Sequence, residues 1–315
     1  MPIREPIVLK EDIKQLKRET DTAVFAHNYM DPDIVEIADV CGDGFDLAMA
    51  AANAPQKNIL ICGVRYIAET AAVMAPDKNI RLSHSQAGCP MTGRVSAARV
   101  EMFREQNPDV CIVVSINSSL QIKANADICV TPTNAVSVIR ALSRDKILFL
   151  PDGSLGEYIA KMVPEKQIEV WPGGCPVLRS VERSDIELAR RKWPNVPVAV
   201  SSRCRSEVTE LADMIGSTNE IISFCEDSAH EVIICDEMAI HARMNEKYPE
   251  KFFKQLAPSK LICNSMRLTT LEIVERALKQ EAGEQILVPF DLADAAREPI
   301  DAMIKLMSVK KRKRT

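Results

Sequence analysis

The 315-residue chain lacks several of the patterns by which a protein's biochemical class is usually recognised. It has no CxxC pair and only four histidines, which argues against a zinc ribbon, a thioredoxin-like dithiol and a zinc site of mixed ligands. It contains neither a glycine-rich dinucleotide fingerprint nor a GxxxxGK phosphate loop. It also has no run of eighteen apolar residues and no apolar segment behind a basic start, so we expect neither membrane insertion nor secretion.

The charge and the cysteine content favour a cytoplasmic protein that acts on small molecules. The net charge of −4 provides no overall attraction to nucleic acid, and we interpret the basic run at 310–314 as a solvated chain end, so a nucleic-acid partner is not expected. Ten cysteines in a large chain without a signal peptide are typical of a reducing compartment.

Three cysteines mark a threefold internal repeat. Cys89, Cys175 and Cys263 follow one another at intervals of 86 and 88 residues, and each lies 65–67 residues after the start of an apolar strand. The three opening strands begin at Ala23, Val110 and Val196. Each segment is then expected to run through a helix, a second strand, another helix and a third strand before its cysteine. Similarity at a fixed period indicates a duplicated supersecondary unit.

The alternation of helical and strand-like segments predicts parallel sheets joined by crossover helices. For example, DIVEIADVC (33–41) has helical apolar spacing and ILICGV (59–64) reads as a buried strand. In such sheets ligands bind beyond the carboxyl ends of the strands, where three thiolates from three repeats can meet. Three thiolates with a vacant fourth position suit an iron–sulfur cluster.

The remaining cysteines are expected to be small core residues, because they lie in or beside apolar runs. They are Cys41, Cys62, Cys111, Cys129, Cys204, Cys225 and Cys235. The three repeat cysteines differ, since they lie in AGCP, GGCP and ICNS, where small or turn-forming residues allow a bulky ligand to approach the backbone.

Blocks along nearly the whole chain resemble the quinolinate synthase family. They include AHNYM, CGVRYIAETA, SINSS, TNAV, VWPGGC and IGST, together with the late ICNSM, all in family order. The resemblance implies an α/β fold of three pseudo-symmetric three-layer α/β/α domains, each with a short parallel sheet, around a central pocket. We expect these domains at 1–98, with the C-terminal helices of 280–315 packed on it, at 99–185 and at 186–279.

The resemblance also implies a cofactor and a set of site residues. A [4Fe-4S] cluster would be held by Cys89, Cys175 and Cys263, with the fourth iron open to substrate as a Lewis acid. The family motifs place catalytic roles on His27, Tyr29 and Glu237. They place substrate binding on Asn117, Thr133, Arg203, Ser217 and Thr218. The implied substrates are small carboxylated or phosphorylated molecules.

Five side chains that we expect to face the substrate depart from the family pattern, at Gly44, Ser115, Pro132, Ser201 and Arg203. Gly44 replaces a serine of Gly-Asp-Ser, Ser115 replaces the tyrosine of Tyr-Val-Asn, and Pro132 replaces a serine ahead of Thr133. The block His-Pro-Glu-Cys reads Ser201-Ser202-Arg203-Cys204, which removes a histidine and a carboxylate. The positive charge of Arg203 suits bidentate binding of a carboxylate or phosphate.

These departures predict an enzyme of this family with a substrate altered from iminoaspartate plus dihydroxyacetone phosphate, because each unmatched buried hydrogen-bonding group costs about 1–3 kcal/mol. Three alternatives stay open. The first is an authentic quinolinate synthase of NAD biosynthesis with a rearranged pocket. The second is an enzyme that transfers sulfur through the open iron, and the third is a non-catalytic iron–sulfur sensor.

Overall fold

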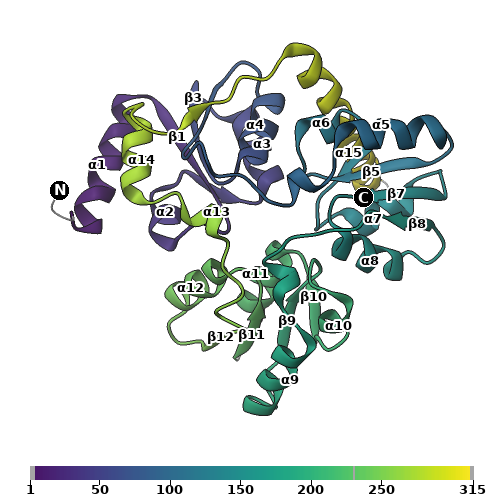
Figure 1. Cartoon of the computed structure of the whole chain (residues 1–315). Coiled ribbons are helices and arrows are strands. Elements are labelled where there is room, and N and C mark those ends of the chain that lie inside the picture. The colour runs from purple at the N-terminus through teal and green to yellow at the C-terminus, as the bar shows by residue number, and fades with distance from the viewer. Residues whose placement is uncertain (1–3, 230, 313–315) are drawn as a thin grey trace. The chain divides into compact units, whose positions relative to one another are not determined.

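A computed structural model describes residues 4–229 and 231–312 (Figure 1). These residues form two compact units. The first unit comprises Met1–Cys89 and Cys263–Pro289, and the second comprises Pro90–Ile262 and Phe290–Thr315. The first unit contains one sheet and the second contains two, and the strands of each repeat are parallel, which confirms the expected class of three α/β repeats.

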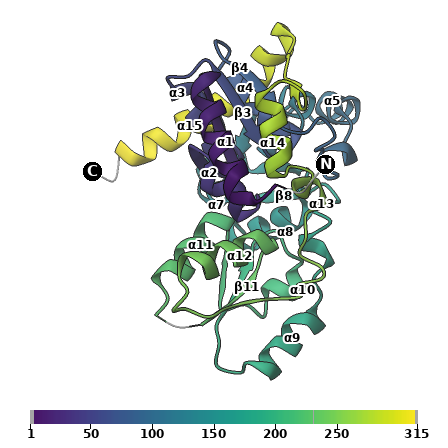
Figure 2. The same ribbon diagram turned by 90° about the vertical axis from the view of Figure 1, so that its left-hand side faces the viewer.

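The sheet of the first unit has the order β13-β4-β3-β1-β2. Its strands are β1 (Thr22–His27), β2 (Val40–Gly42), β3 (Asn58–Cys62), β4 (Asn79–Leu82) and the antiparallel β13 (Glu284–Gln285). The helices of this unit are α1 (Pro6–Glu19), α2 (Pro32–Ile37), α3 (Gly44–Asn53), α4 (Arg65–Met74), α13 (Asn264–Arg267) and α14 (Leu271–Leu278). Helices α1 and α14 pack side by side, and α3 packs against α4 (Figures 1 and 2).

The second unit contains the other two repeats. The second repeat has the strand order β6-β5-β7-β8, with β5 (Cys111–Ser115), β6 (Ile128–Val130), β7 (Lys146–Leu150) and β8 (Gln167–Val170). The third has the order β10-β9-β11-β12, with β9 (Val198–Ser201), β10 (Met214–Gly216), β11 (Val232–Cys235) and β12 (Phe253–Gln255). The helices are α5 (Ala97–Gln106), α6 (Leu120–Lys123), α7 (Ala135–Ala141), α8 (Gly153–Met162), α9 (Arg183–Lys192), α10 (Ser206–Thr209), α11 (Thr218–Asp227), α12 (Met238–Lys247) and α15 (Phe290–Arg312).

The three repeats share one local interaction between their first two strands. In each repeat an aspartate just before the second strand accepts a hydrogen bond from the backbone N–H of the residue fifteen positions earlier, in the first strand. The three bonds are Val24 N to Asp39 at 2.7 Å, Ile112 N to Asp127 at 2.7 Å and Val198 N to Asp213 at 2.8 Å. We call these three carboxylates the strand-linking aspartates.

A basic side chain from the helix before each repeat completes this arrangement. It forms an ion pair with the strand-linking aspartate and donates to the backbone carbonyl two residues earlier. The pairs are Lys17–Asp39, Arg104–Asp127 and Arg190–Asp213, and the carbonyls are those of Ile37, Asn125 and Leu211. The helix, the first strand and the second strand of every repeat are therefore fixed at one point.

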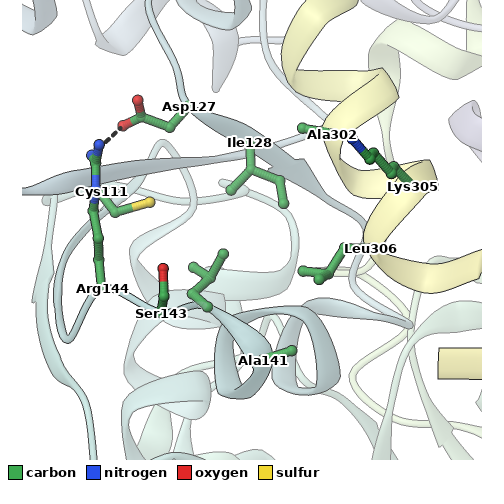
Figure 3. Close-up of a pocket in the computed structure, with 10 residues that line it drawn as sticks. Cys111, Asp127, Ile128, Ala141, Ser143, Arg144, Ala302, Lys305 and Leu306 are labelled. Atoms are coloured by element: carbon green, nitrogen blue, oxygen red, sulfur yellow. Dashed lines mark ion pairs between the residues drawn. The ribbon is translucent and has the colours of Figure 1, made fainter. Parts of the chain in front are cut away.

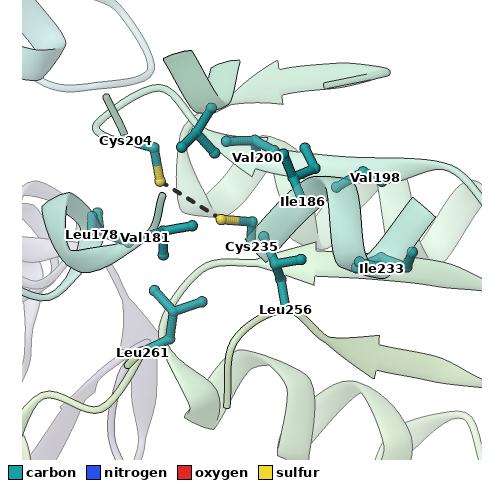
Figure 4. Packing of buried hydrophobic residues seen from close by; sticks show 12 residues of the cluster. Leu178, Val181, Ile186, Val198, Val200, Cys204, Ile233, Cys235, Leu256 and Leu261 are labelled. Carbon is teal, nitrogen blue, oxygen red and sulfur yellow. Dashed lines mark hydrogen bonds between the residues drawn. The ribbon is translucent and has the colours of Figure 1, made fainter. Parts of the chain in front are cut away.

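The core of the third repeat shows how the apolar strand residues pack. Val198 and Val200 of β9 and Ile233 of β11 are fully buried against Leu178 and Leu261 (Figure 4). In the same cluster the sulfur atoms of Cys204 and Cys235 lie 3.7 Å apart. Six of the seven cysteines expected to be core residues are buried, which confirms the prediction for Cys204 and five others.

The expectation for Cys41 is wrong, because its side chain is exposed. The chain at 33–41 does not form one helix: α2 ends at Ile37 and Cys41 lies in β2, an edge strand of three residues. Side chains alternate between the faces of a strand, and Cys41 is on the outward face while Gly42 is buried.

The C-terminal helices also differ from the expected domain boundaries. Residues 263–289, including α14, belong to the first unit and not to the third repeat. Helix α15 packs on β6, α6 and α7 of the second repeat and not on the first. Its apolar face supplies Ala296, Ile300 and Met303 to that core. None of the helices in the described part of the chain is long and apolar enough to cross a membrane. Residues 313 and 314 of the basic run lie outside the described residues.

Replacing a strand-linking aspartate should destabilise the protein. We expect Asp127→Ala to lower the free energy of unfolding by about 1–3 kcal/mol, because the N–H of Ile112 loses its partner in a buried strand. Asp145→Ala is the control, since Asp145 is exposed and makes only a surface ion pair with Lys166. Urea unfolding of both variants measures the difference, and equal stabilities would contradict the role of Asp127.

Candidate active site

The three repeat cysteines lie in equivalent loops. Each follows the last parallel strand of its repeat: Cys89 follows β4, Cys175 follows β8, and Cys263 follows β12 at the N-cap of α13. All three cysteines are partly exposed, whereas six of the other seven cysteines are buried. Cys89 and Cys263 belong to the first unit and Cys175 to the second.

These loops suit the attachment of a bulky cluster. A side chain added at Gly88 would meet no atom within 4 Å, so the backbone beside Cys89 is open. Gly173 and Gly174, before Cys175, have φ angles of +139° and +141°, which favour glycine. Thiols are the usual ligands of iron–sulfur clusters, so the donor set fits the group. Within the described residues no group of three His, Cys, Asp or Glu side chains is arranged to hold a single metal ion.

Two thiols near these loops differ in their electrostatic surroundings. Burial raises the pKa of the Cys175 thiol, and the nearby Arg203 guanidinium partly opposes this increase. The Cys204 thiol has its pKa raised by the Cys235 thiol and by burial. Cys204 is therefore held as a neutral core group.

His27 and Tyr29 form a pair at the carboxyl end of β1. Both are buried, and their rings pack edge to face with centroids 4.9 Å apart. The Nδ1 atom of His27 accepts a hydrogen bond from the backbone N–H of Tyr29 at 3.1 Å. The neutral imidazole therefore carries its proton on Nε2. This is the arrangement expected of a histidine that exchanges protons at one nitrogen.

Serines occupy the positions equivalent to His27 in the other two repeats. Ser115 accepts from the backbone N–H of Asn117 at 3.3 Å, and Ser201 accepts from that of Arg203 at 3.5 Å. In each case the acceptor side chain lies two residues before the donating N–H, as in the bond between His27 and Tyr29. Ser115 and Ser201 thus make the same local bond as His27 with a smaller side chain.

Hydroxyl and carboxyl groups from the second and third repeats meet in the second unit. Thr133 donates to Ser217 at 3.0 Å, and Ser217 donates to Glu220 at 2.8 Å at the N-terminus of α11. Thr218 donates to Asp236 at 2.7 Å. These bonds join Thr133, Ser217 and Thr218, three of the expected substrate-binding residues, to two carboxylates.

Glu237 has a structural contact that the sequence does not reveal. Its fully buried carboxylate accepts from the backbone N–H of Ala239 at 2.6 Å and caps α12. The N–H of Glu237 itself donates to Asp236 at 2.7 Å. A side chain that caps a helix stabilises the fold, so the burial of Glu237 has a cause apart from catalysis.

Arg203 is paired with a carboxylate that sequence analysis missed. Its Nε atom donates to Asp152 at 2.7 Å, and the Asp152 side chain is fully buried. Asp152 follows β7 and Asp236 follows β11, and neither was expected at the site. The available signal was their position directly beyond strand ends, in FLPD and ICDE.

Asp43 is a further acid near a family motif. It caps α3 through bonds from the backbone N–H groups of Phe45 and Asp46. Burial and the neighbouring Asp46 carboxylate raise the pKa of Asp43 to about 6. The carboxyl can therefore exchange a proton near neutral pH, although Gly44 lacks the hydroxyl that the family usually has beside it.

Comparison with known proteins identifies the family. The family model described as quinolinate synthetase A protein matches residues 11–305. A quinolinate synthase of Caldicellulosiruptor bescii is 40% identical over 300 residues, which cover 95% of this chain and 98% of the relative. The quinolinate synthases of Aquifex aeolicus and Geobacter sp. (strain M21) are 35% and 36% identical, and in both comparisons 95% of this chain is covered. On this full-length similarity, the chain belongs to the quinolinate synthase family.

Proposed function

We propose that the protein is a quinolinate synthase, which condenses iminoaspartate with dihydroxyacetone phosphate to form pyridine-2,3-dicarboxylate. The observation that carries this proposal is the similarity to proteins of that name across 95% of the chain. The five departures described above are single positions within an otherwise complete set of family blocks. The authentic activity is therefore better supported than an altered one.

Enzymes of this family use a [4Fe-4S] cluster. We propose Cys89, Cys175 and Cys263 as its ligands, because they are partly exposed and lie in equivalent loops of the three repeats. When bound, the cluster supplies Lewis-acid chemistry at its iron without a cysteine ligand.

Protons in the reaction are proposed to move through His27 and Tyr29. The bond from the Tyr29 backbone to Nδ1 holds the ring so that Nε2 carries the exchangeable proton. The edge-to-face contact of the two rings fixes the direction of the Tyr29 side chain. A buried acid or base with a fixed direction is what general acid–base catalysis needs.

Anionic groups of the substrates are proposed to bind at Asn117, Thr133, Ser217 and Thr218. Ser217 caps α11, and the N-terminus of a helix favours phosphate and carboxylate groups. The hydroxyl protons of Ser217 and Thr218 point to Glu220 and Asp236 in this structure. To bind an anion, these hydroxyl groups would have to turn their protons from the carboxylates toward the anion.

A second candidate function is the same chemistry on a different substrate. It is favoured by the buried pair of Arg203 and Asp152, where the family has a glutamate at position 203. The pair replaces a free acid with a fixed guanidinium, which suits a substrate with an additional carboxylate.

The ligand assignment predicts which cysteines retain iron. Cys89→Ser, Cys175→Ser and Cys263→Ser should each lose the cluster, because a thiolate ligand is removed. Iron content and visible absorption of anaerobically purified protein measure the loss. Cys204→Ala is the matched control and should keep its iron, since Cys204 is buried beside Cys235. Full iron in any of the three serine variants would overturn the assignment.

The proton-transfer role predicts a loss of turnover without loss of the cluster. His27→Ala should reduce kcat by about 10²–10⁴-fold, which is typical for removal of a general acid or base. Tyr29→Phe keeps the ring packing and should also reduce kcat. Single-turnover kinetics with iron content as the control provide the test. Normal activity in His27→Ala would show that this residue has only a structural role.

The two candidate functions differ in the product. Reconstituted protein given iminoaspartate and dihydroxyacetone phosphate under strict anaerobiosis should form quinolinate over many turnovers, followed by mass spectrometry. If a protein with a complete cluster forms none, the altered-substrate function replaces the authentic one. Arg203→Lys then serves as a probe, because it keeps the charge opposite Asp152 but loses the planar fork needed to bind a carboxylate.

A further inference from the structure

A cavity of about 460 Å³ lies in the second unit, away from the proposed active site. It is bounded by the beginnings of β5 and β6, by the turn after α7 and by α15 (Figure 3). Because Cys111 and Ile128 are the first residues of their strands, the cavity is at the amino-terminal edge of the sheet. Two of the proposed substrate-binding residues, Asn117 and Thr133, follow the carboxyl ends of the same strands.

The walls of the cavity are mainly apolar. Ile128 is buried, and Leu142 and Leu306 are half-buried. Burial and the Asp127 carboxylate raise the pKa of the Cys111 thiol to about 11. Cys111 therefore remains neutral and contributes an uncharged surface.

Two cationic side chains, Arg144 and Lys305, line the cavity on opposite sides of the labelled apolar residues (Figure 3). Arg144 approaches Asp127 at 3.7 Å, a longer contact than the 3.1 Å pair that Asp127 makes with Arg104. Asp127 also accepts from the N–H of Ile112, so it is a satisfied strand-linking aspartate. Lys305 lies on α15, and within the described part of the chain no acidic group forms an ion pair with it. The charge at the cavity is thus net positive.

We propose that this cavity binds a small carboxylate with an apolar body, such as an aromatic or branched aliphatic acid. The apolar body would lie against Ile128, Leu142 and Leu306, and the carboxylate would be bound by Arg144. A pocket with an apolar lining and few polar groups is the usual form of a small-molecule site. A charge-assisted hydrogen bond from a guanidinium fixes the orientation of a carboxylate.

The cavity is connected to the proposed active site through one helix. Met303 and Met307 of α15 are adjacent to the lining residues, and their sulfur atoms accept hydrogen bonds from the Asn134 side chain at 3.3 Å and 3.0 Å. Asn134 in turn accepts from the N–H of Thr131 at 2.8 Å. The loop so held contains Thr133, a proposed substrate-binding residue. Occupation of the cavity would fix α15 and thereby this loop, which makes the cavity an effector site.

Calorimetric titration of the full-length protein with benzoate and with the branched acid 3-methylbutanoate tests the binding. We expect saturable millimolar binding of at least one acid and no binding of benzyl alcohol, which lacks the carboxylate. Arg144→Gln should weaken the affinity by about tenfold, as expected for one charged hydrogen bond. Leu142→Trp should abolish binding by filling the cavity. Lys146→Gln is the matched control, since Lys146 pairs with Asp109 outside the cavity.

Absence of binding by both acids, or equal affinity in wild type and Arg144→Gln, would overturn the site. Hydrogen exchange of residues 131–135 tests the connection. It should slow with bound benzoate in the wild type and remain unchanged in Asn134→Ala. Unchanged exchange in the wild type would reject the effector role. These measurements do not require turnover, so their failure is distinguishable from failure of the proposed function.

Discussion

The hydrogen bond from the first strand of each repeat to an aspartate fifteen residues later determines how the rest of the repeat is built. In each repeat the aspartate carboxylate accepts a hydrogen bond from the first strand and pairs with a basic side chain. These two interactions hold the second strand, which has only three residues, beside the first. Without them, the short second strand would have little to hold its register against the first. With the register fixed, the loops beyond both strands are placed at the carboxyl edge, where the proposed site residues lie.

The repeat itself could be predicted because it is periodic in length and in apolar strands. The second strand of the first repeat could be predicted less well, since β2 has three residues and follows α2 without a glycine or proline to separate them. The apolar spacing of 33–41 fits a helix as well as it fits a helix followed by a strand. Cys41 was misjudged for this reason. The location of α15 could not be predicted, because an amphipathic pattern shows that a helix has a packing face but not which sheet it covers.

The site shows a similar division. Family motifs indicated His27, Tyr29, Thr133 and Ser217, and the structure joins the first two to each other and the last two to each other. Their chemical roles remain predictions. Asp152 was missed because a lone aspartate after a strand is common, and its importance appears only when Arg203 is found beside it. Arg203, which the sequence predicts to bind substrate, thus also forms a buried ion pair with Asp152. Such a pair is costly to break from either side.

The distribution of the C-terminal segments has a consequence for the order in which the protein folds during synthesis. The first repeat needs α14 and β13, and the second needs α15, so both depend on residues beyond 263. The third repeat has its four strands and helices between Arg183 and Gln255, upstream of these C-terminal segments. Domains generally fold as units while the chain emerges from the ribosome. The last repeat to be made is then the first that can be completed, and the first two repeats wait with open edges until the segments after residue 263 have been synthesised.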